Sequence, residues 1–502
     1  MRIQSIALRL LCIASIALVV PGSLWAAKLF QPTQVYRSGG STAISIVVAD
    51  MNGDAKPDLV VANVCVGPNN CDGGVGVLLG NGDGTFQTAK TFDSGVVFAH
   101  SVAVADLNHD GKLDVAVSHE FSCSPTPCSG LISVLLGKGD GTLAAPHIYP
   151  SGGYEAANVV IADVNGDGKP DLLVANACAG PDFPCNSGGA VGVLLGNGDG
   201  TFGATQSYIL GGPGGTLAVA DANQDGKLDL LVLRGGFLDV LLGNGDGTFQ
   251  SPAIYELGDA VSSLMAVGDV NGDGKPDLLE TNRCFDNGCT SSAVGVLIGN
   301  GDGTFQAEQK YSTGATFALS VALGDVNGDG KPDLVVGHYT GALAVLLGNG
   351  DGTFKTALRY NSGGRNANTI AIADANGDAK PDVVVGNKCL THTDCTSGGV
   401  GVLLGNAAVR TTTNLSSSLN PSIHGHPVTF TATVISTGPQ PPTGKVKFWD
   451  GTLGIGSATL SNGVATLTKS TLAVGTHPIT AQYLGDANSA KSTSSVLNQV
   501  VQ

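Results

Sequence analysis

Several features of membrane proteins and nucleic-acid-binding proteins are missing from this sequence. Beyond the first 26 residues, no stretch approaches the roughly 20 apolar residues that a membrane span needs. The net charge is −16, and its sign disfavours binding to nucleic acid or to an anionic lipid surface. The apolar residues show no helical periodicity. We therefore expect an all-β protein that inserts into no membrane and binds no nucleic acid.

Groups that commonly carry catalysis are also sparse. The nine histidines are scattered along the chain, and neither a metal-protease motif nor a nucleophile elbow is present. His119 and Glu120 form the one pair of note, and a solvated strand end accounts for them. Because catalysis needs convergent acid, base or nucleophile groups, the sequence favours a non-catalytic protein.

Residues 1–26 have the composition of a secretory signal peptide. Arg2 and Arg9 give a positive n-region, residues 10–20 are mostly apolar, and Leu24 and Ala26 suit cleavage before Ala27 or one residue later. We therefore expect an exported protein, located outside the cell or on its surface.

Cysteine is used in local couples that are either complete or absent. Cys12 lies in the signal segment, and repeats four and six, defined below, lack both members of the couple. This pattern predicts disulfides in an exported protein. Zinc is the alternative, but two thiolates per loop do not complete a four-coordinate site. The predicted pairs are Cys65/Cys71, Cys123/Cys128, Cys178/Cys185, Cys284/Cys289 and Cys389/Cys395.

One acidic loop of nine residues occurs seven times. Its positions 1, 3, 5 and 9 are always Asp, Asn, Asp and Asp, and clustered oxygen ligands of this kind hold calcium. The alternative is an Asx- and Gly-rich hairpin turn that needs no ion, although three carboxylates on one tight turn would then repel one another. An EF-hand is excluded, because Val61 stands where position 12 needs Glu. The loops begin at Asp50, Asp106, Asp163, Asp221, Asp269, Asp325 and Asp374.

The spacing of these loops, 48 to 58 residues, predicts a seven-bladed β-propeller. Each repeat contains four short β-rich segments, which we name A to D, with the acidic loop between A and B and the cysteine loop between B and C. The last repeat ends near Asn406 without a D strand, and the segment from Phe30 resembles an isolated D strand. We therefore expect it to complete the last blade and to remove the open edges of the ring.

Antiparallel blades of this kind put the A–B loops and C–D turns on one face and the B–C and D–A connections on the other.

From Thr411 the pattern changes to alternating strands without acidic loops, which predicts a second domain, a seven-strand β-sandwich.

Residues 28–407 resemble the FG-GAP/VCBS-type repeats of secreted bacterial proteins, which are related to the integrin α-subunit propeller. Residues 411–502 resemble a bacterial Ig-like domain, on the segments GKVKFWDG from Gly444 and ITAQYLGDANSAKSTS from Ile479. The first resemblance implies up to seven calcium ions, one per blade, each bound also by the carbonyl of loop position 7. The implied side-chain ligands are Asp50, Asn52, Asp54 and Asp58; Asp106, Asn108, Asp110 and Asp114; Asp163, Asn165, Asp167 and Asp171; Asp221, Asn223, Asp225 and Asp229; Asp269, Asn271, Asp273 and Asp277; Asp325, Asn327, Asp329 and Asp333; and Asp374, Asn376, Asp378 and Asp382.

Position 6 of the loop distinguishes two of these sites. It is Gly in loops two to six, but Ala55 in the first loop and Ala379 in the last. If this position needs a positive φ, alanine costs about 1–2 kcal/mol there, so we expect these two sites to bind calcium more weakly.

Aromatic residues divide into repeating and non-repeating sets. The repeating Tyr of strand D and the Phe of the GTF turns are assigned to blade packing. The non-repeating ones fall in or near B–C and D–A connections, where they are candidate ligand contacts, or alternatively cap the ends of the blades. They are Phe98, Phe121, Tyr154, Phe183, Phe237, Phe285, Phe317 and Tyr339.

These observations favour a secreted or cell-surface, calcium-stabilised adhesion or recognition protein with a glycan or an extracellular protein as its partner. Two alternatives remain. Some polysaccharide lyases resemble this type of propeller, and a purely structural matrix component has the same sequence features.

Overall fold

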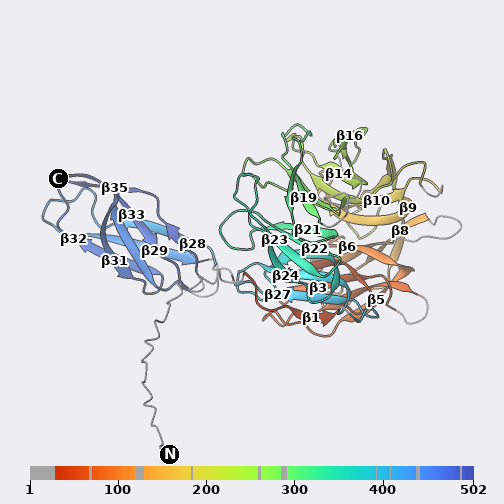
Figure 1. The fold of residues 1–502 in the computed structure, drawn as a ribbon, viewed down its shortest axis with the longest axis horizontal. Coiled ribbons are helices and arrows are strands. Elements are labelled where there is room, and N and C mark those ends of the chain that lie inside the picture. The colour runs from red at the N-terminus through yellow and green to blue at the C-terminus, as the bar shows by residue number, and fades with distance from the viewer. Residues whose placement is uncertain are drawn as a thin grey trace, which may run out of the picture.

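The computed structural model describes residues 29–66, 71–119, 129–181, 185–257, 262–283, 291–391, 393–406, 409–436, 441–486 and 489–502. The predicted signal peptide lies outside these residues. The described chain forms a ring of β-sheets followed by a separate β-sandwich (Figure 1). All its regular elements are strands, and it contains no helix that is long and apolar enough to cross a membrane.

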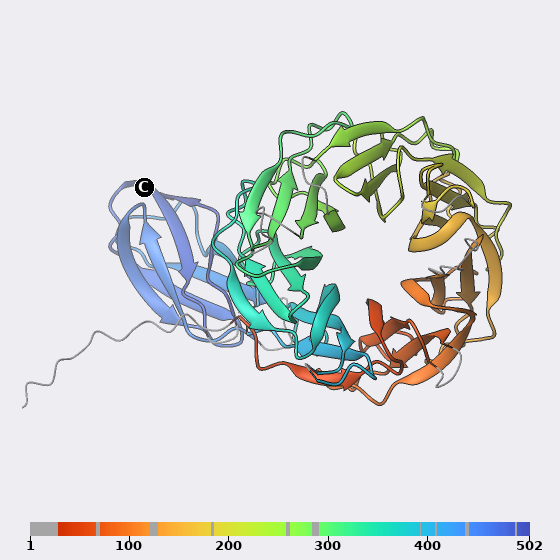
Figure 2. The same ribbon diagram turned by 45° about the vertical axis from the view of Figure 1, so that its right-hand side comes forward.

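Seven four-stranded units make up the ring in the described part of the chain, when β9 is counted in two of them. Figure 2 shows these units around a central opening. We call them blades 1 to 7. Their innermost strands are β2 (Ala43–Ala49), β6 (Ala99–Ala105), the second half of β9 (His147–Ala162), β13 (Thr216–Ala220), β17 (Ser262–Gly268), β21 (Ala318–Gly324) and β25 (Arg365–Ala373).

Each innermost strand pairs with an antiparallel second strand, which pairs in turn with a third. The second strands are β3 (Asp58–Asn63), β7 (Asp114–His119), β10 (Asp171–Cys178), β14 (Asp229–Arg234), β18 (Asp277–Asn282), β22 (Asp333–His338) and β26 (Asp382–Cys389). The third strands are β4 (Asp72–Leu78), β8 (Ser129–Leu135), β11 (Ala190–Leu194), β15 (Phe237–Leu241), β19 (Ala293–Leu297), β23 (Ala342–Leu346) and β27 (Gly399–Leu403).

The outer strands confirm that the ring is closed by the N-terminal segment. The outer strand of blade 7 is β1, which pairs antiparallel with β27 in the register Gln34↔Val402. Beyond it, Phe30 and Gly405 form an isolated bridge. The outer strands are β5 (Lys90–Val97), the first half of β9, β12 (Gln206–Ile209), β16 (Ala253–Glu256), β20 (Gln309–Ser312), β24 (Leu358–Asn361) and β1 (Gln34–Arg37).

Apolar side chains fill the spaces between adjacent blades. In β3, Val60 belongs to the cluster against blade 2, whereas Leu59 and Val61 belong to the cluster against blade 7. Both faces of this strand are therefore covered, and all six of its residues are buried. This explains why the second strands are continuous apolar runs rather than alternating ones.

Aromatic pairs join the outer parts of neighbouring blades, as the sequence predicts. Tyr208 of blade 3 lies edge-on to Phe249 of blade 4, with ring centroids 5.6 Å apart, which is a favourable geometry. The same relationship joins Tyr36 to Phe86, Tyr149 to Phe202, Tyr255 to Phe305, Tyr311 to Phe354 and Tyr360 to Phe30.

The C-terminal unit is a β-sandwich with eight strands in its described residues, not seven. Phe430, Phe448 and Tyr483 are fully buried between its two sheets. The difference arises because the last segment pairs with β33 twice, first as a strand of two residues and then again after a break. The sheets contain β28 (Thr411–Ser417), β29 (Val428–Ser436) and β32 (Val464–Lys469), and β30 (Lys445–Asp450), β31 (Leu453–Thr459), β33 (Gly475–Tyr483), β34 (Ser492–Thr493) and β35 (Leu497–Val501).

Candidate functional site

The first aspartate of each acidic loop organises the loop backbone. In the first loop, Asp50 Oδ1 accepts hydrogen bonds from the N–H groups of Gly53 and Asp54, and Oδ2 accepts one from Ala55 at 2.8 Å. Asn52 Oδ1 accepts a further bond from Asp54 N, at 3.0 Å. The Asp50 and Asn52 oxygens therefore lie side by side, because they share a donor. The turn forms through its own side chains, as Asx-type loops do.

The ninth residue of each loop is buried and joins the A–B loop to the C–D turn. Asp58 Oδ2 accepts a hydrogen bond from Met51 N at 2.9 Å, and Oδ1 accepts one from Gly80 N at 2.7 Å. This pair of bonds places the acidic loops and the C–D turns on one face, as predicted. Every loop has the same arrangement, at Asp114, Asp171, Asp229, Asp277, Asp333 and Asp382.

Burial of these aspartates raises the pKa of each carboxyl above its usual value. Desolvation is the largest cause, and the neighbouring loop carboxylates add to it. For Asp333 and Asp382 the pKa rises to about 7. A cation close to these aspartates would lower the electrostatic cost of keeping their buried carboxylates charged.

The donor set of the loops fits a calcium ion. It consists of oxygen atoms alone, and the exposed carboxylate of Asp54 accepts a hydrogen bond from Lys56 N at 3.0 Å and lies 3.5 Å from Lys56 Nζ. With the Lys56 carbonyl, Asp50, Asn52, Asp54 and Asp58 would hold the ion in the first loop. The three carboxylates of a loop do not, however, all lie within 4.8 Å of one another in the described chain.

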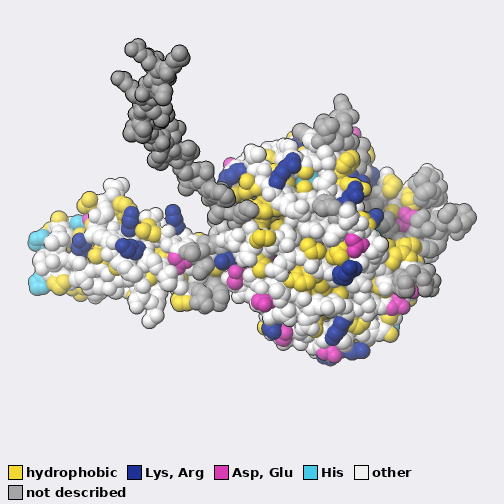
Figure 3. Space-filling model, turned by 60° about the horizontal axis from the view of Figure 1, so that its bottom comes forward, with side chains coloured by type: hydrophobic (Ala, Val, Ile, Leu, Met, Phe, Trp, Pro, Cys, Tyr) yellow, Lys and Arg dark blue, Asp and Glu magenta, His cyan; other side chains and the backbone are white. Residues whose placement is uncertain are grey.

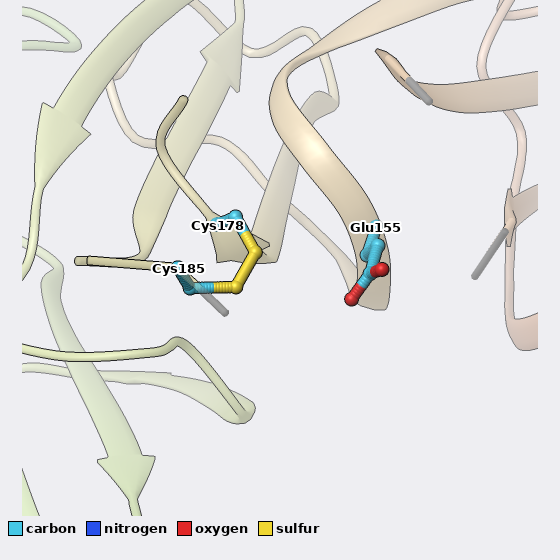
Figure 4. A group of neighbouring side chains, drawn as sticks. All are labelled: Glu155, Cys178 and Cys185. Atoms are coloured by element: carbon cyan, nitrogen blue, oxygen red, sulfur yellow. A yellow bond between two sulfur atoms is a disulfide. The ribbon is translucent and has the colours of Figure 1, made fainter. Parts of the chain in front are cut away.

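One side-chain cluster of the described chain does meet that distance, but its chemistry argues against a metal. It contains Glu155, Cys178 and Cys185 (Figure 4). The two sulfur atoms are joined in a disulfide, so they provide no thiolate ligand.

The backbone at loop position 6 has the positive φ on which the prediction of two weaker calcium sites depends. Ala55 and Ala379 have φ values of 62° and 61°, in the region that glycine occupies in the other five loops. The weaker calcium binding expected at these two sites stays a prediction.

The cysteine loops lie on the opposite face of the ring. Disulfides join Cys65 to Cys71, Cys178 to Cys185 and Cys389 to Cys395, as predicted. Ser41 N donates to Cys65 O at 2.8 Å, so B–C and D–A connections meet on this face, which we call the cysteine face. Cys123, Cys128, Cys284 and Cys289 lie outside the described residues.

The described candidate aromatics are on the cysteine face, with different exposure. Phe98 and Tyr154 are half-buried, and Tyr154 pairs with Cys178 in the sheet register. Phe317 and Tyr339 are 41% and 43% exposed, and their ring centroids are 6.3 Å apart. Phe121, Phe183 and Phe285 lie outside the described residues. The structure thus brings together Phe317 and Tyr339.

The expectation of a solvated strand end at His119 is wrong. Its side chain is buried, with Nε2 2.8 Å from Ser133 Oγ and Nδ1 3.2 Å from Val97 O. Desolvation lowers its pKa to about 4, so the ring is neutral at pH 7. The preceding D strand covers this strand end, which the sequence of β7 alone does not reveal. Glu120 lies outside the described residues.

A cavity of about 370 Å³ at the centre of the ring was missed by the sequence analysis. Asn158 links blades around it: Asn158 Nδ2 donates to Ser101 Oγ at 3.1 Å, and Leu217 N donates to Asn158 Oδ1 at 3.0 Å. The signal was present, because the fifth residue before six of the seven acidic loops is Ser, Thr or Asn. These residues, with the exception in blade 5, are Ser45, Ser101, Asn158, Thr216, Leu264, Ser320 and Thr369.

Charge on the propeller surface is mixed. On the side shown in Figure 3, basic and acidic side chains are interspersed among hydrophobic ones. In each acidic loop a lysine stands two residues after the exposed aspartate of position 5. In the second loop, Lys112 Nζ lies 3.2 Å from Asp110 Oδ2. The acidic loops are therefore partly neutralised by their own lysines.

Comparisons with solved structures yield low TM-scores. A lectin from Agrocybe aegerita, described for its specific recognition of non-reducing terminal N-acetylglucosamine, is 21% identical, with a TM-score of 0.43 over 64% of this chain and 80% of that one. An extracellular domain from B. thetaiotaomicron, described as part of a one-component system and also of a hybrid two-component system, is 10% identical, with a TM-score of 0.42 over 94% of this chain. This chain spans 60% and 59% of the two structures of that domain.

Sequence models of families match most of the chain. No curated protein matches it. The model of the FG-GAP-like repeat matches residues 50–117, 123–174, 180–232, 221–280, 287–336 and 325–385, and that of the bacterial Ig-like domain (group 3) matches residues 415–502. The chain therefore belongs to the family of FG-GAP-like repeat proteins and carries a bacterial Ig-like domain at its C-terminal side.

Proposed function

We propose that this protein is an exported, calcium-stabilised and non-catalytic recognition protein, which binds a glycan or an extracellular protein through its cysteine face. The observation that carries the proposal is the exposed pair of Phe317 and Tyr339 on that face. Aromatic rings are costly to leave in water, and surface groups of them mark binding sites.

The opposite face, which carries the acidic loops, has a different role in this proposal. Its loops repeat nearly unchanged in every blade, and their buried aspartates join loop to turn within the blade. A repeated ion of this kind stabilises architecture, whereas the sequence of the cysteine face varies from blade to blade. The local disulfides support export to an oxidising compartment.

The test is binding of residues 28–502 to a broad glycan array and to a panel of extracellular proteins, first with calcium and then with a chelator. We expect a ligand whose binding weakens in chelator and is lost when Phe317 and Tyr339 are both changed to Ala. A ligand that binds the double variant as well as the unchanged protein would place recognition elsewhere. Turnover of a bound polysaccharide would replace the non-catalytic proposal with a lyase.

A further inference from the structure

Blades 4 and 6 lack cysteine loops, and in each an aromatic ring in or next to the B–C turn lies under an arginine. In blade 4 the turn is Gly235–Gly236, and the Arg234 guanidinium carbon lies 4.9 Å from the centroid of the Phe237 ring. In blade 6 the turn is residues 339–341, and the guanidinium carbon of Arg365 lies 5.0 Å from the centroid of Tyr339. Arg234 belongs to blade 4 itself, whereas Arg365 begins the innermost strand of blade 7, so the second contact joins two blades.

Their charges are compensated differently. The Arg234 guanidinium is buried and donates two hydrogen bonds to Asp239, from Nε to Oδ2 at 2.7 Å and from Nη2 to Oδ1 at 2.9 Å. Such a bidentate pair is complete in itself. Arg365 is half-buried, and in the described part of the chain its contact is the Tyr339 ring rather than a carboxylate. Arg365 therefore presents, beside Tyr339 of blade 6, a positive charge that is open to an external anion.

The backbone around Tyr339 is held in an unusual conformation. Phe317 and Asn366 have positive φ values of 54° and 53°, and for a bulky residue such as Phe this is rare. Tyr339 N donates to Phe317 O, and Asn366 N donates to Tyr339 O, both at 3.0 Å. Three connections from different blades are thus fixed together. The same positive φ occurs at the equivalent residues Phe98 and Glu155, so it is a feature of these connections in several blades.

A polar atom beside this cluster also has no partner. Asn366 Oδ1 is buried without a hydrogen bond, and buried oxygen atoms in proteins are normally satisfied. The backbone N–H of Asn366 donates to Tyr339 O, so this oxygen belongs to a residue that is fixed to the cluster.

We propose that Phe317, Tyr339 and Arg365 form a binding site for a carboxylate-bearing pyranose, such as a hexuronic acid unit of a polysaccharide. This inference rests on the proposed function of the cysteine face. The apolar C–H face of the sugar ring packs on the aromatic rings, which removes both from water. The carboxylate accepts hydrogen bonds from the planar guanidinium, a geometry that lysine does not reproduce.

The experiment is calorimetric titration of the calcium-loaded protein with oligomers of galacturonate, glucuronate and mannuronate, and with neutral galactose and mannose oligomers. We expect at least one acidic oligomer to bind at least ten-fold more tightly than the neutral ones, and its binding to weaken with added salt. Arg365→Gln should abolish this preference, Arg365→Lys should restore only part of it, and Tyr339→Ala should reduce affinity for the acidic oligomer at least ten-fold. Arg37→Gln, which removes an exposed arginine that lies 3.9 Å from the Asp394 carboxylate, is the control and should bind as the unchanged protein does.

The outcomes separate this inference from the proposed function. Failure of all three acidic oligomers to bind, or unchanged binding by Arg365→Gln, overturns the inference. If a neutral glycan or a protein then binds in a way that needs Phe317 and Tyr339, the proposed function stands without it. Thermal unfolding of each variant shows whether a loss of binding reflects a loss of folding, and Tyr339→Phe provides a second variant that keeps the ring.

Discussion

Arg410, in the segment between the ring and the sandwich, donates a hydrogen bond from Nη2 to Asp325 Oδ2 at 2.9 Å. Asp325 is the first residue of the sixth acidic loop, and the same oxygen accepts the N–H of Gly330 at 2.7 Å. The Arg410 guanidinium is therefore hydrogen-bonded to an oxygen atom that would be a ligand of a calcium ion in this loop. The segment leading to the second domain is in contact with one acidic loop of the seven.

We predict that Arg410→Ala strengthens calcium binding in the sixth loop by up to about five-fold, because an exposed ion pair contributes about 0.2–1 kcal/mol. The amide resonance of Gly330 during a calcium titration reports on this loop. Arg359→Ala, which changes an arginine of the outer strand β24, is the control and should leave the titration unchanged. Weaker binding in Arg410→Ala would mean that the arginine supports the loop instead of competing with the ion.

The two alanines at loop position 6 give a second prediction. Ala55→Gly and Ala379→Gly should each raise the free energy of unfolding by about 1 kcal/mol, because glycine adopts φ near +60° without strain. Calcium affinity of the first and last loops should rise with it. Ala49→Gly, within strand β2, should instead destabilise the protein. Equal occupancy of all seven loops in the unchanged protein would contradict the prediction of two weak sites.

Buried and exposed aspartates of one loop should behave differently. Asp171→Asn replaces a carboxylate that accepts the N–H groups of Val164 and Gly196 with an amide that accepts only one, so we expect a loss of about 1–3 kcal/mol of stability even in chelator. Asp167→Asn, at an exposed position of the same loop, should lower calcium affinity but leave stability in chelator nearly unchanged. Urea unfolding with and without calcium distinguishes them. Equal losses in chelator would argue against the bridging role of Asp171.

A buried acidic pair in blade 5 predicts a dependence of stability on pH. Glu280 is buried where the other blades have valine, and it lies beside Glu308. Desolvation, together with the hydrogen bond and the charge of Glu280, raises the pKa of Glu308 to about 8 from 4.5. The folded protein therefore keeps a proton that the unfolded chain releases, so stability contributed by this pair is present below pH 4.5 and is lost as pH rises towards 8.

Glu280→Val should weaken that dependence, since only the desolvation of Glu308 then remains. It should also raise the free energy of unfolding at pH 8 by about 1–3 kcal/mol, because it removes a buried polar group from a core position. Denaturant unfolding between pH 5 and pH 8 measures the effect. Val336→Glu, which introduces the acid at the same position of blade 6, should have the opposite effect. A pH profile of Glu280→Val that matches the unchanged protein would refute the prediction.

The features that repeat could be predicted from the sequence, and those that depend on one pair of distant residues could not. The pairing of β1 with β27 and the contact of Tyr208 with Phe249 follow from the repeat, because the arrangement of strands and side chains in one repeat applies to every repeat. The approach of Arg365 to Tyr339 depends on how the connections of two blades lie in space. The burial of His119, in blade 2, likewise depends on Val97 in the outer strand of blade 1.

Closure of the ring also settles the direction in which the propeller presents its surfaces. Leu29 O accepts the N–H of Asn406 at 2.7 Å, so the chain enters and leaves the ring at adjacent points. Gly405 N donates to Asp382, which places both points on the acidic side. The cysteine face therefore lies on the opposite side of the ring from both of these points. A large ligand, even a polymer, could approach this face without meeting Leu29 or Asn406, where the described chain enters and leaves the ring.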